Sequence, residues 1–136
     1  MEIRELMTKG CSYLAPNTSL AQAAQKMSED DIGSLPIGEN DKLIGMVTDR
    51  DIVVRGIAEG KDASATSVSE VMSDNLYYCF DDQLADDVAS NMSEMQVRRL
   101  PVVDREKRLV GIVTLGDLAA KGAPAKAKKA LEGISQ

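Results

Sequence analysis

The dominant feature of the sequence is an internal duplication. The segment Ile3-Arg4-Glu5-Leu6-Met7 reappears as Val68-Ser69-Glu70-Val71-Met72, 65 positions further along. Two copies are too few for a solenoid, and in a chain of 136 residues each copy is too small to bury a core alone. We therefore expect the two copies to pack together as one body. Further matches, at a spacing of 65 that becomes 66 after one extra residue, are Tyr13 with Tyr78, Ala24 with Ala89, Met27 with Met92, Leu35-Pro36 with Leu100-Pro101, Gly45 with Gly111, Asp51 with Asp117 and Gly56 with Gly122.

Each copy predicts the same order of elements, β-α-β-β-α. A short extended segment, residues 12–14 or 76–79, precedes a stretch with apolar residues at helical spacing. Asn17-Thr18-Ser19 and Asp81-Asp82 are the expected helix start signals. The expected strands are 35–37 and 43–47 in the first copy and 100–103 and 109–113 in the second. The apolar helix positions are Leu20, Ala23, Ala24 and Met27, then Leu84, Val88, Ala89 and Met92.

The fold class that follows is α/β, in its α+β form, with two β-α-β-β-α repeats whose helices pack together about a pseudo-twofold axis. We expect repeat 1 over residues 1–60, a polar linker over 61–67, repeat 2 over 68–122 and a tail over 123–136. Ala, Lys and Leu dominate the tail, which predicts a helix that docks at one edge or at a dimer contact. Its lysines are expected to form a solvated face.

Composition excludes several classes of function. The chain has no His, which rules out Ser-His and Cys-His nucleophiles and His-ligated metals. Its net charge is −6, whereas nucleic acids and anionic membranes recruit basic surfaces. The apolar runs are far shorter than the roughly 20 residues of a membrane span, and the charged N-terminus does not fit a signal peptide. We expect a cytoplasmic protein that binds neither nucleic acid nor membrane, with Cys11 and Cys79 as partly buried thiols.

The motif Gly-x-Val-Thr-x-x-Asp carries the chemistry. It occurs as Gly45-Met46-Val47-Thr48-Asp49-Arg50-Asp51 and as Gly111-Ile112-Val113-Thr114-Leu115-Gly116-Asp117, each time between a predicted buried strand and a predicted helix. One interpretation is structural, because Thr-x-x-Asp resembles a helix capping box. The other is functional: free N–H groups at a helix start bind anions, Asp accepts ribose hydroxyls, and glycine lets a flat base approach the backbone. Recurrence of the motif in both copies favours the functional interpretation.

The order of elements, the Leu-Pro-Val strand and the duplicated motif resemble a tandem cystathionine-β-synthase (CBS) domain pair, from about Ile3 to Gly122. The segments at 31–37, 48–53 and 96–102 are similar to stand-alone bacterial members of the family, often regarded as energy or stress sensors. The resemblance implies a non-catalytic regulatory module. Such modules bind an adenine nucleotide (AMP, ADP, ATP or NAD, in some members S-adenosylmethionine) in clefts between the two repeats.

The resemblance also implies which residues contact the ligand. Asp51 and Asp117 match the family's ribose-binding Asp, and Thr48 and Thr114 match its motif hydroxyl. The apolar position that lies against the base is occupied by Met46 and by Ile112.

Phosphate contacts are implied by the residues before the strand proline. Arg98 and Arg99 match positions where family members place a phosphate-binding side chain. The first copy has Gly33 and Ser34 there, so Arg50 is expected to supply its cation. The two sites are therefore expected to be unequal.

Two alternatives stay open beside the nucleotide-binding module. One is a ligand-free interaction or stress-response scaffold that forms a dimer. The other is a divalent-ion sensor that uses the acidic groups at 28–31 or 81–87, although helix capping and the helix dipole also explain those carboxylates. An enzyme is not expected, because the sequence has no phosphate-binding Gly-x-x-x-x-Gly-Lys-Ser/Thr loop and no nucleophile beside a base. The expected partners are a small adenosine ligand, a second copy of the chain and an unidentified protein target.

Overall fold

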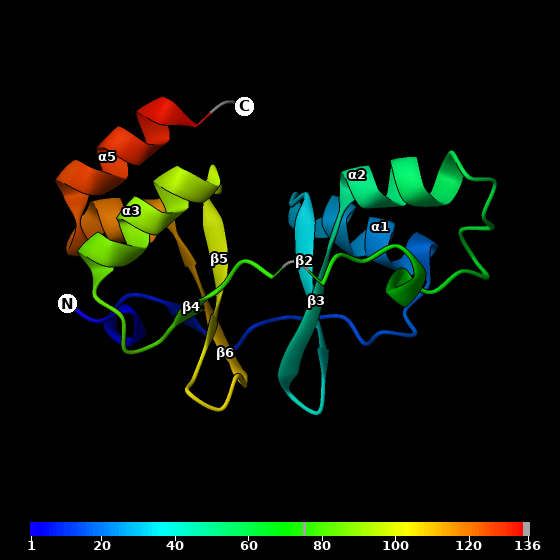
Figure 1. The fold of residues 1–136 in the computed structure, drawn as a ribbon, viewed down its shortest axis with the longest axis horizontal. Coiled ribbons are helices and arrows are strands. Elements are labelled where there is room, and N and C mark those ends of the chain that lie inside the picture. The colour runs from blue at the N-terminus through cyan, green and yellow to red at the C-terminus, as the bar shows by residue number, and fades with distance from the viewer. Residues whose placement is uncertain (75, 135–136) are drawn as a thin grey trace. The chain divides into compact units, whose positions relative to one another are not determined.

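A computed structural model describes residues 1–74 and 76–134. The chain forms two compact units, one made of Met1–Cys11 with Tyr77–Gln136 and the other of Ser12–Leu76 (Figure 1). These units are a different division of the chain from the two sequence repeats, because the first eleven residues pack with the second repeat. The α/β class and the β-α-β-β-α order of each repeat are confirmed. The pseudo-twofold packing of the repeats stays a prediction.

The unit Ser12–Leu76 is built on a hairpin of β2 (Ser34–Glu39) and β3 (Lys42–Thr48). Asn40 and Asp41 form its two-residue turn, both with positive φ, as a tight hairpin turn requires. The expected extended segment at 12–14 reduces to a single parallel bridge from Leu14 to Ile37. The other elements are α1 (Leu20–Asp30), α2 (Asp49–Asp51), η2 (Ile52–Ile57) and η3 (Val68–Glu70).

Helix α1 begins where the sequence predicts. Ser19 is its N-cap and forms a capping box with Gln22, in which each side chain accepts a hydrogen bond from the other residue's backbone N–H. Leu20, Ala23 and Met27 are buried, and they join one core cluster with the hairpin strands. Ala24 is exposed, contrary to the periodic pattern. The core side of α1 is therefore narrower than expected.

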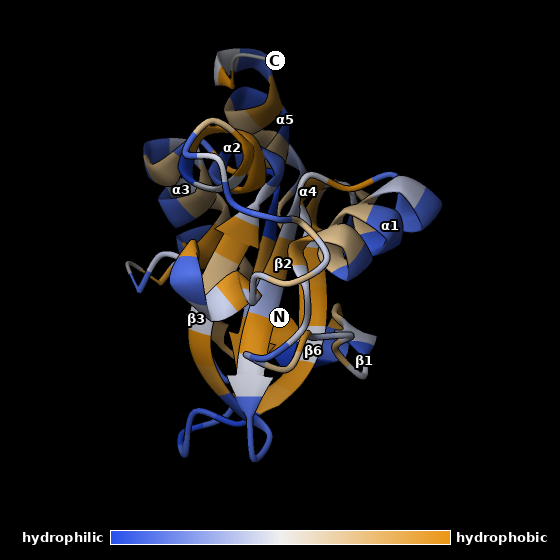
Figure 2. Cartoon of the chain, turned by 90° about the vertical axis from the view of Figure 1, so that its right-hand side faces the viewer, coloured by the Kyte–Doolittle hydropathy of each residue, from blue (hydrophilic) through white to orange (hydrophobic). Residues whose placement is uncertain are grey.

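The other unit holds a four-stranded sheet in the order β1-β6-β5-β4. Strand β4 is parallel to β5, and the remaining pairs are antiparallel. In Figure 2 the strands are largely apolar, whereas α1 and α3 carry hydrophilic residues on their outer sides. The elements of this unit are η1 (Ile3–Glu5), β1 (Thr8–Lys9), β4 (Cys79–Phe80), α3 (Ala85–Met95), β5 (Arg99–Val103), β6 (Leu109–Thr114), α4 (Leu115–Asp117), η4 (Leu118–Gly122) and α5 (Pro124–Gly133).

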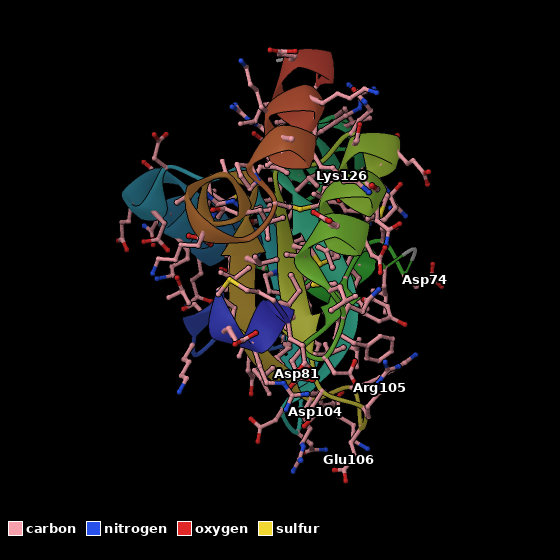
Figure 3. All side chains as sticks on the ribbon, turned by 90° about the vertical axis from the view of Figure 1, so that its left-hand side faces the viewer. Asp74, Asp81, Asp104, Arg105, Glu106 and Lys126 are labelled. Carbon is pink, nitrogen blue, oxygen red and sulfur yellow. The ribbon has the colours of Figure 1, made fainter. Side chains whose placement is uncertain are left out.

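The predicted start signal of α3 is wrong. Its N-cap is Leu84, whose side chain makes no capping hydrogen bond, and not Asp81 or Asp82. The Asp82 carboxylate instead accepts two hydrogen bonds from Arg105, at 2.8 and 2.6 Å, and Arg105 also stacks over the Phe80 ring. Figure 3 shows Arg105 in the turn between β5 and β6. Asp82 therefore anchors that turn, where its charge has a planar partner.

The segments that lead into the two sequence repeats are exchanged, so that each pairs with the other repeat. Residues 3–9 come before the first repeat's helix, yet β1 pairs with β6 of the second repeat. Residues 68–73 come before the second repeat's helix, yet Ser73 bridges Met46 in β3. This exchange fills the space beside the motif glycines: a Cβ on Gly45 would meet Met72, and a Cβ on Gly111 would meet Met7 and Thr8. The prediction that these glycines admit a flat base is therefore wrong, because the chain itself occupies that side.

The tail forms α5, as its composition predicts, with Pro124 in the first turn. Helix α5 packs against α3, α4 and η4 and buries Ala127 and Ala130. Lys126, labelled in Figure 3, is exposed, as are the other two tail lysines. Positions 135 and 136 of the tail lie outside the described residues.

Candidate functional site

Both motifs form the same capping box at the strand-to-helix junction. The Thr48 backbone N–H donates to Asp51 Oδ2 at 2.9 Å, and the Asp51 N–H donates to Thr48 Oγ1 at 3.0 Å. In the second repeat Thr114 donates to Asp117 Oδ2 at 3.0 Å, and Asp117 donates to Thr114 Oγ1 at 3.1 Å. The structural interpretation of the motif is therefore confirmed. Asp substitutes for Glu or Gln here because it reaches the same backbone N–H.

The capping role leaves part of each carboxylate for other contacts. Within residues 1–74 and 76–134, the hydrogen bonds that Asp51 and Asp117 accept go to Oδ2. Both residues are half-buried, and a carboxylate oxygen that makes no capping bond keeps its chemical capacity to accept hydroxyl hydrogen bonds. The capping box fixes the orientation of the carboxylate, and a fixed acceptor loses little conformational entropy when a ligand binds.

Each motif helix changes its winding directly after the capping box. Helix α2 continues as η2 and α4 continues as η4, and both continuations are π-helical. The π-helix is rare, and its single-turn form inside α-helices is frequent at functional sites, whereas here the π-helical turns end each helix. Because the same change occurs in both repeats, it is a property of the motif and not of one local packing contact.

In the second repeat the predicted phosphate-binding residues lie beside the motif. The Arg98 carbonyl accepts a hydrogen bond of 2.9 Å from the N–H of Leu115, the first residue of α4. Arg99 lies opposite Thr114 in the β5–β6 register, and Ile112 precedes Thr114 on β6. Both arginine side chains are exposed. The backbones of two exposed arginines thus lie beside the N-terminus of the helix that carries Asp117.

The first repeat builds the same junction with different charges. Asp49, the first residue of α2, donates its N–H to the Gly33 carbonyl at 2.9 Å. Ser34 lies opposite Thr48, where the second repeat has Arg99. A hollow of about 300 Å³ is lined by Asp49, Arg50, Val53 and Val54.

The hollow contains the expected cation Arg50, but also Asp49, an anion that the sequence analysis did not single out. In the second repeat the position of Asp49 is held by Leu115, which is buried. Comparing the two copies of the motif could have revealed this difference. Met46, whose backbone exchanges hydrogen bonds with Ser73, lies on β3 before Thr48. The structure thus places the predicted site residues at the two junctions, and the charged residues differ between the two.

The two cysteines are free thiols, Cys11 partly buried and Cys79 buried. Burial raises the pKa of Cys11 from 9.0 to about 11. Burial, together with the charge of Asp81, raises the pKa of Cys79 to about 12. Both thiols are therefore protonated at neutral pH, a state in which cysteine is a weak nucleophile.

The acidic groups considered for a divalent ion do not gather into a site. Among residues 1–74 and 76–134, no three His, Cys, Asp or Glu side chains lie close enough together to hold a metal ion. Asp82 binds Arg105 instead, and hydrogen bonds from that guanidinium lower the Asp82 pKa. In the same described part, no helix is long and apolar enough to cross a membrane.

The profile of the CBS domain matches residues 3–56 and again residues 68–123. The chain belongs to the CBS domain family. It is similar to hypoxic response protein 1 of Mycobacterium tuberculosis, with 44% identity over 117 residues that cover 85% of this chain and 81% of the relative.

Solved structures of CBS proteins share the fold. A crystal structure of hypoxic response protein I with two coordinated zinc ions has a TM-score of 0.77 and 42% identity, and the match covers 88% of this chain and 98% of that one. The CBS domain pair of MJ0100, in complex with 5-methylthioadenosine and S-adenosyl-L-methionine, has a TM-score of 0.72 and 30% identity. That match covers 88% of this chain and 94% of the other. CBSX2 in complex with AMP has a TM-score of 0.74 and 26% identity, and the match covers 93% of this chain and 98% of that one.

Proposed function

We propose that this protein is a non-catalytic regulatory module that binds an adenine nucleotide, of the AMP, ADP, ATP or NAD type. The observation that carries the proposal is the junction in the second repeat. Arg98 and Arg99 flank the start of a helix whose capping Asp117 keeps one carboxylate oxygen for a ligand. Two structural relatives with adenosine ligands, the MJ0100 domain pair and CBSX2, support the ligand class.

Each residue of the second-repeat junction has a distinct proposed role. Asp117 Oδ1 accepts a ribose hydroxyl, and the Thr114 side chain lies beside the ribose or base. Ile112 supplies the apolar contact to the base. Arg98 or Arg99 binds phosphate through charge-assisted hydrogen bonds. The corresponding residues of the first repeat are Met46, Thr48, Arg50 and Asp51, and Asp49 beside Arg50 makes that site the weaker one for an anion.

The proposal includes the setting in which the module works. We place it in the cytoplasm, as a homodimer that passes nucleotide occupancy to a protein target. The exposed apolar residues Val53, Val54 and Ile57 favour an association surface whether or not nucleotide binds. A ligand-free dimer scaffold is therefore the second candidate function.

The test is titration calorimetry of AMP against wild type and Asp117→Asn. Asn keeps one oxygen for the Thr114 N–H, so we expect nearly unchanged stability. Its NH₂ group replaces the oxygen that would accept the ribose hydroxyl, so AMP affinity should fall at least tenfold, about 1.4 kcal/mol. Asp51→Asn is the matched control in the weaker site and should change AMP affinity less.

Two outcomes would contradict the proposal. If Asp117→Asn binds AMP as wild type does, Asp117 is only a helix cap. If wild type gives no binding heat with AMP, ADP, ATP, NAD or S-adenosylmethionine at millimolar concentration, the ligand-free scaffold is the better description.

A further inference from the structure

A polar groove of about 250 Å³ lies between α3 and the tail helix α5, and we call it the tail groove. Its lining residues come from both helices and are Ser90, Ser93, Glu94, Lys126, Lys129 and Ala130. Drug-sized ligands fill pockets of about 300–1,000 Å³, so a groove of this volume suits a smaller molecule. None of the lining residues belongs to the two motif junctions, which makes the tail groove a separate feature of the second repeat.

Helix α3 supplies two serine hydroxyls to the tail groove. Ser90 and Ser93 are three positions apart, so they lie on one side of the helix. Each directly follows a fully buried residue, Ala89 or Met92, and the packing of those residues in the core therefore fixes the side of α3 on which the serines lie. Within residues 1–74 and 76–134, neither serine hydroxyl makes a hydrogen bond. Both hydroxyls can therefore donate to a ligand.

Helix α5 supplies two ammonium groups. Lys126 and Lys129 are also three positions apart, and each directly precedes a fully buried alanine, Ala127 or Ala130. These alanines join the same core cluster as residues of α3, which places both lysines along the groove. In the part of the chain that the structure describes, neither lysine forms an ion pair. Their charges are therefore open to an anionic ligand.

The duplication supplies an internal reference for this groove. Ser28 on α1 is the first-repeat counterpart of Ser93, and it is exposed, whereas Ser93 is half-buried. Helix α5 packs against α3, while the described residues 58–67 contain no helix that could cover α1 in the same way. The tail groove is therefore a product of the tail and not of the duplicated fold.

The donors of the tail groove fit a phosphate group. Two ammonium groups and two hydroxyls approach from two helices, and a tetrahedral phosphate has enough acceptor oxygens to use all of them. Phosphate carries close to two negative charges at neutral pH, which match the two lysines. The chain carries −6 overall, but α5 has three lysines and one glutamate, a net +2. An anion is therefore attracted to this end of the molecule.

Glu94 separates phosphate from another kind of ligand. Among the described residues that line the groove, Glu94 alone is anionic, and its carboxylate opposes a bound phosphate. A zwitterion such as an amino acid would instead place its ammonium group beside Glu94. With two ammonium groups against one carboxylate the lining is positive, and this balance favours the anion.

We propose that the tail groove binds a small anion of the phosphate class through its two lysines and two serine hydroxyls. The residues proposed for the nucleotide, Arg98, Arg99 and Asp117, do not line the groove, so this site does not depend on nucleotide binding. Because the anion contacts both α3 and α5, its binding stabilises the docked position of the tail helix.

The test is an NMR titration of the full chain with inorganic phosphate, with sodium chloride used to hold the ionic strength constant. We expect saturable shifts of backbone amide resonances on both α3 and α5. Lys126→Gln and Lys129→Gln should each weaken phosphate binding about fivefold, as expected for an exposed ion pair. The matched control is Lys128→Gln, because Lys128 is exposed on the same helix but does not line the groove, and its affinity should equal that of wild type.

Glu94→Gln gives a change in the opposite direction. It removes the carboxylate that opposes the anion, so phosphate should bind more tightly than to wild type. All four substituted residues are exposed, so thermal unfolding in chloride should match that of wild type.

Four other results would overturn the proposal. Shifts that do not saturate, or that chloride produces equally, show that the groove has no specific affinity for phosphate. An equal loss in Lys128→Gln assigns the effect to the general charge of α5. Saturable shifts that Arg98→Ala abolishes place the phosphate at the nucleotide junction. A groove that binds glutamate but not phosphate, and loses glutamate in Glu94→Gln, is a site for a zwitterion.

Discussion

At the residue scale, Thr-x-x-Asp has a structural role that is independent of any ligand. Asp117→Ala removes the acceptor of the Thr114 N–H, so we expect a loss of about 0.5–2 kcal/mol of folding free energy. Asp51→Ala should cost a similar amount through the Thr48 N–H. Urea unfolding followed by circular dichroism measures both losses, with a lower midpoint and an unchanged slope. No loss in either variant would show that water replaces the cap at no cost.

The Cys79 thiol gives the folded protein a dependence on alkaline pH. Its pKa is about 12 in the folded chain against an ordinary 9.0, because burial and Asp81 disfavour the thiolate. Above pH 9 the unfolded chain therefore loses this proton first. The stabilisation is fully present below pH 9 and is lost progressively as the pH rises toward 12.

Between pH 8 and pH 10 we expect the free energy of unfolding of wild type to fall by about 1.4 kcal/mol more than that of Cys79→Ala. Urea unfolding of both proteins at the two pH values measures it, and the comparison cancels the titration of Lys and Tyr. Equal losses in the two proteins would mean that the thiolate is tolerated in the folded core.

Local residue chemistry explains which single-residue expectations hold. Ser19 and Thr48 act as caps because their partners lie three positions away along the chain. Asp82 does not act as a cap because its partner Arg105 is 23 positions away, a separation over which local start signals carry no information. The space beside Gly45 is likewise not predictable from nearby residues, since Met72, 27 positions along the chain, fills it.

At the element scale, the exchanged segments 3–9 and 68–73 depend on the motif glycines. A Cβ on Gly111 would lie 2.6 Å from the Thr8 carbonyl oxygen, so Gly111→Ala must displace β1 from β6. We expect Gly111→Ala to lower the free energy of unfolding by about 1–3 kcal/mol. Gly45→Ala is the matched variant of the first repeat and should cost less, because its nearest obstacle is the flexible Met72 side chain, at 2.6 Å.

Thermal and urea unfolding of the two variants measure the difference between them. A further control is Gly116→Ala, whose Cβ meets only Thr114 Oγ1, at 3.5 Å, and which should leave stability unchanged or raise it by up to about 1 kcal/mol. Equal losses for Gly111→Ala and Gly45→Ala would contradict the assignment of backbone crowding at β1.

The strands and helices could be predicted from the duplication, because each periodic pattern is seen twice. The pairing of β1 with β6 could not, since residues 8–9 and 111–112 are far apart in sequence and no local pattern selects a long-range partner. The π-helical winding of η2 and η4 also cannot be predicted from the spacing of apolar residues. For the candidate site, the sequence predicts residues that lie at the two junctions, and their role in binding stays a prediction. The anion Asp49 is visible in the sequence as a difference between the two copies, and the structure shows that it lines the hollow beside Arg50.

At the scale of the whole molecule, the unequal charges of the two repeats lead to a prediction that a ligand's phosphate matters at one junction only. The chain is acidic overall, so an anionic ligand needs a local source of positive charge, and Arg98 and Arg99 provide it in the second repeat. We expect AMP to bind about 10- to 100-fold more tightly than adenosine there, as a charge-assisted hydrogen bond predicts. Arg98→Ala or Arg99→Ala should remove the preference and leave adenosine affinity unchanged.

Salt and pH complete this prediction. The preference for AMP should shrink as salt rises, because exposed arginines are screened. Between about pH 6.5 and 8 the affinity should be flat, since the chain has no His, the thiols have pKa values of about 11 and 12, and the phosphate has passed its second ionisation near 6. Calorimetry of AMP and adenosine at two salt concentrations measures both effects. Equal affinities for the two ligands in wild type, unaffected by either arginine substitution, would exclude phosphate anchoring, and any ligand recognition would then depend on Asp117 and Ile112.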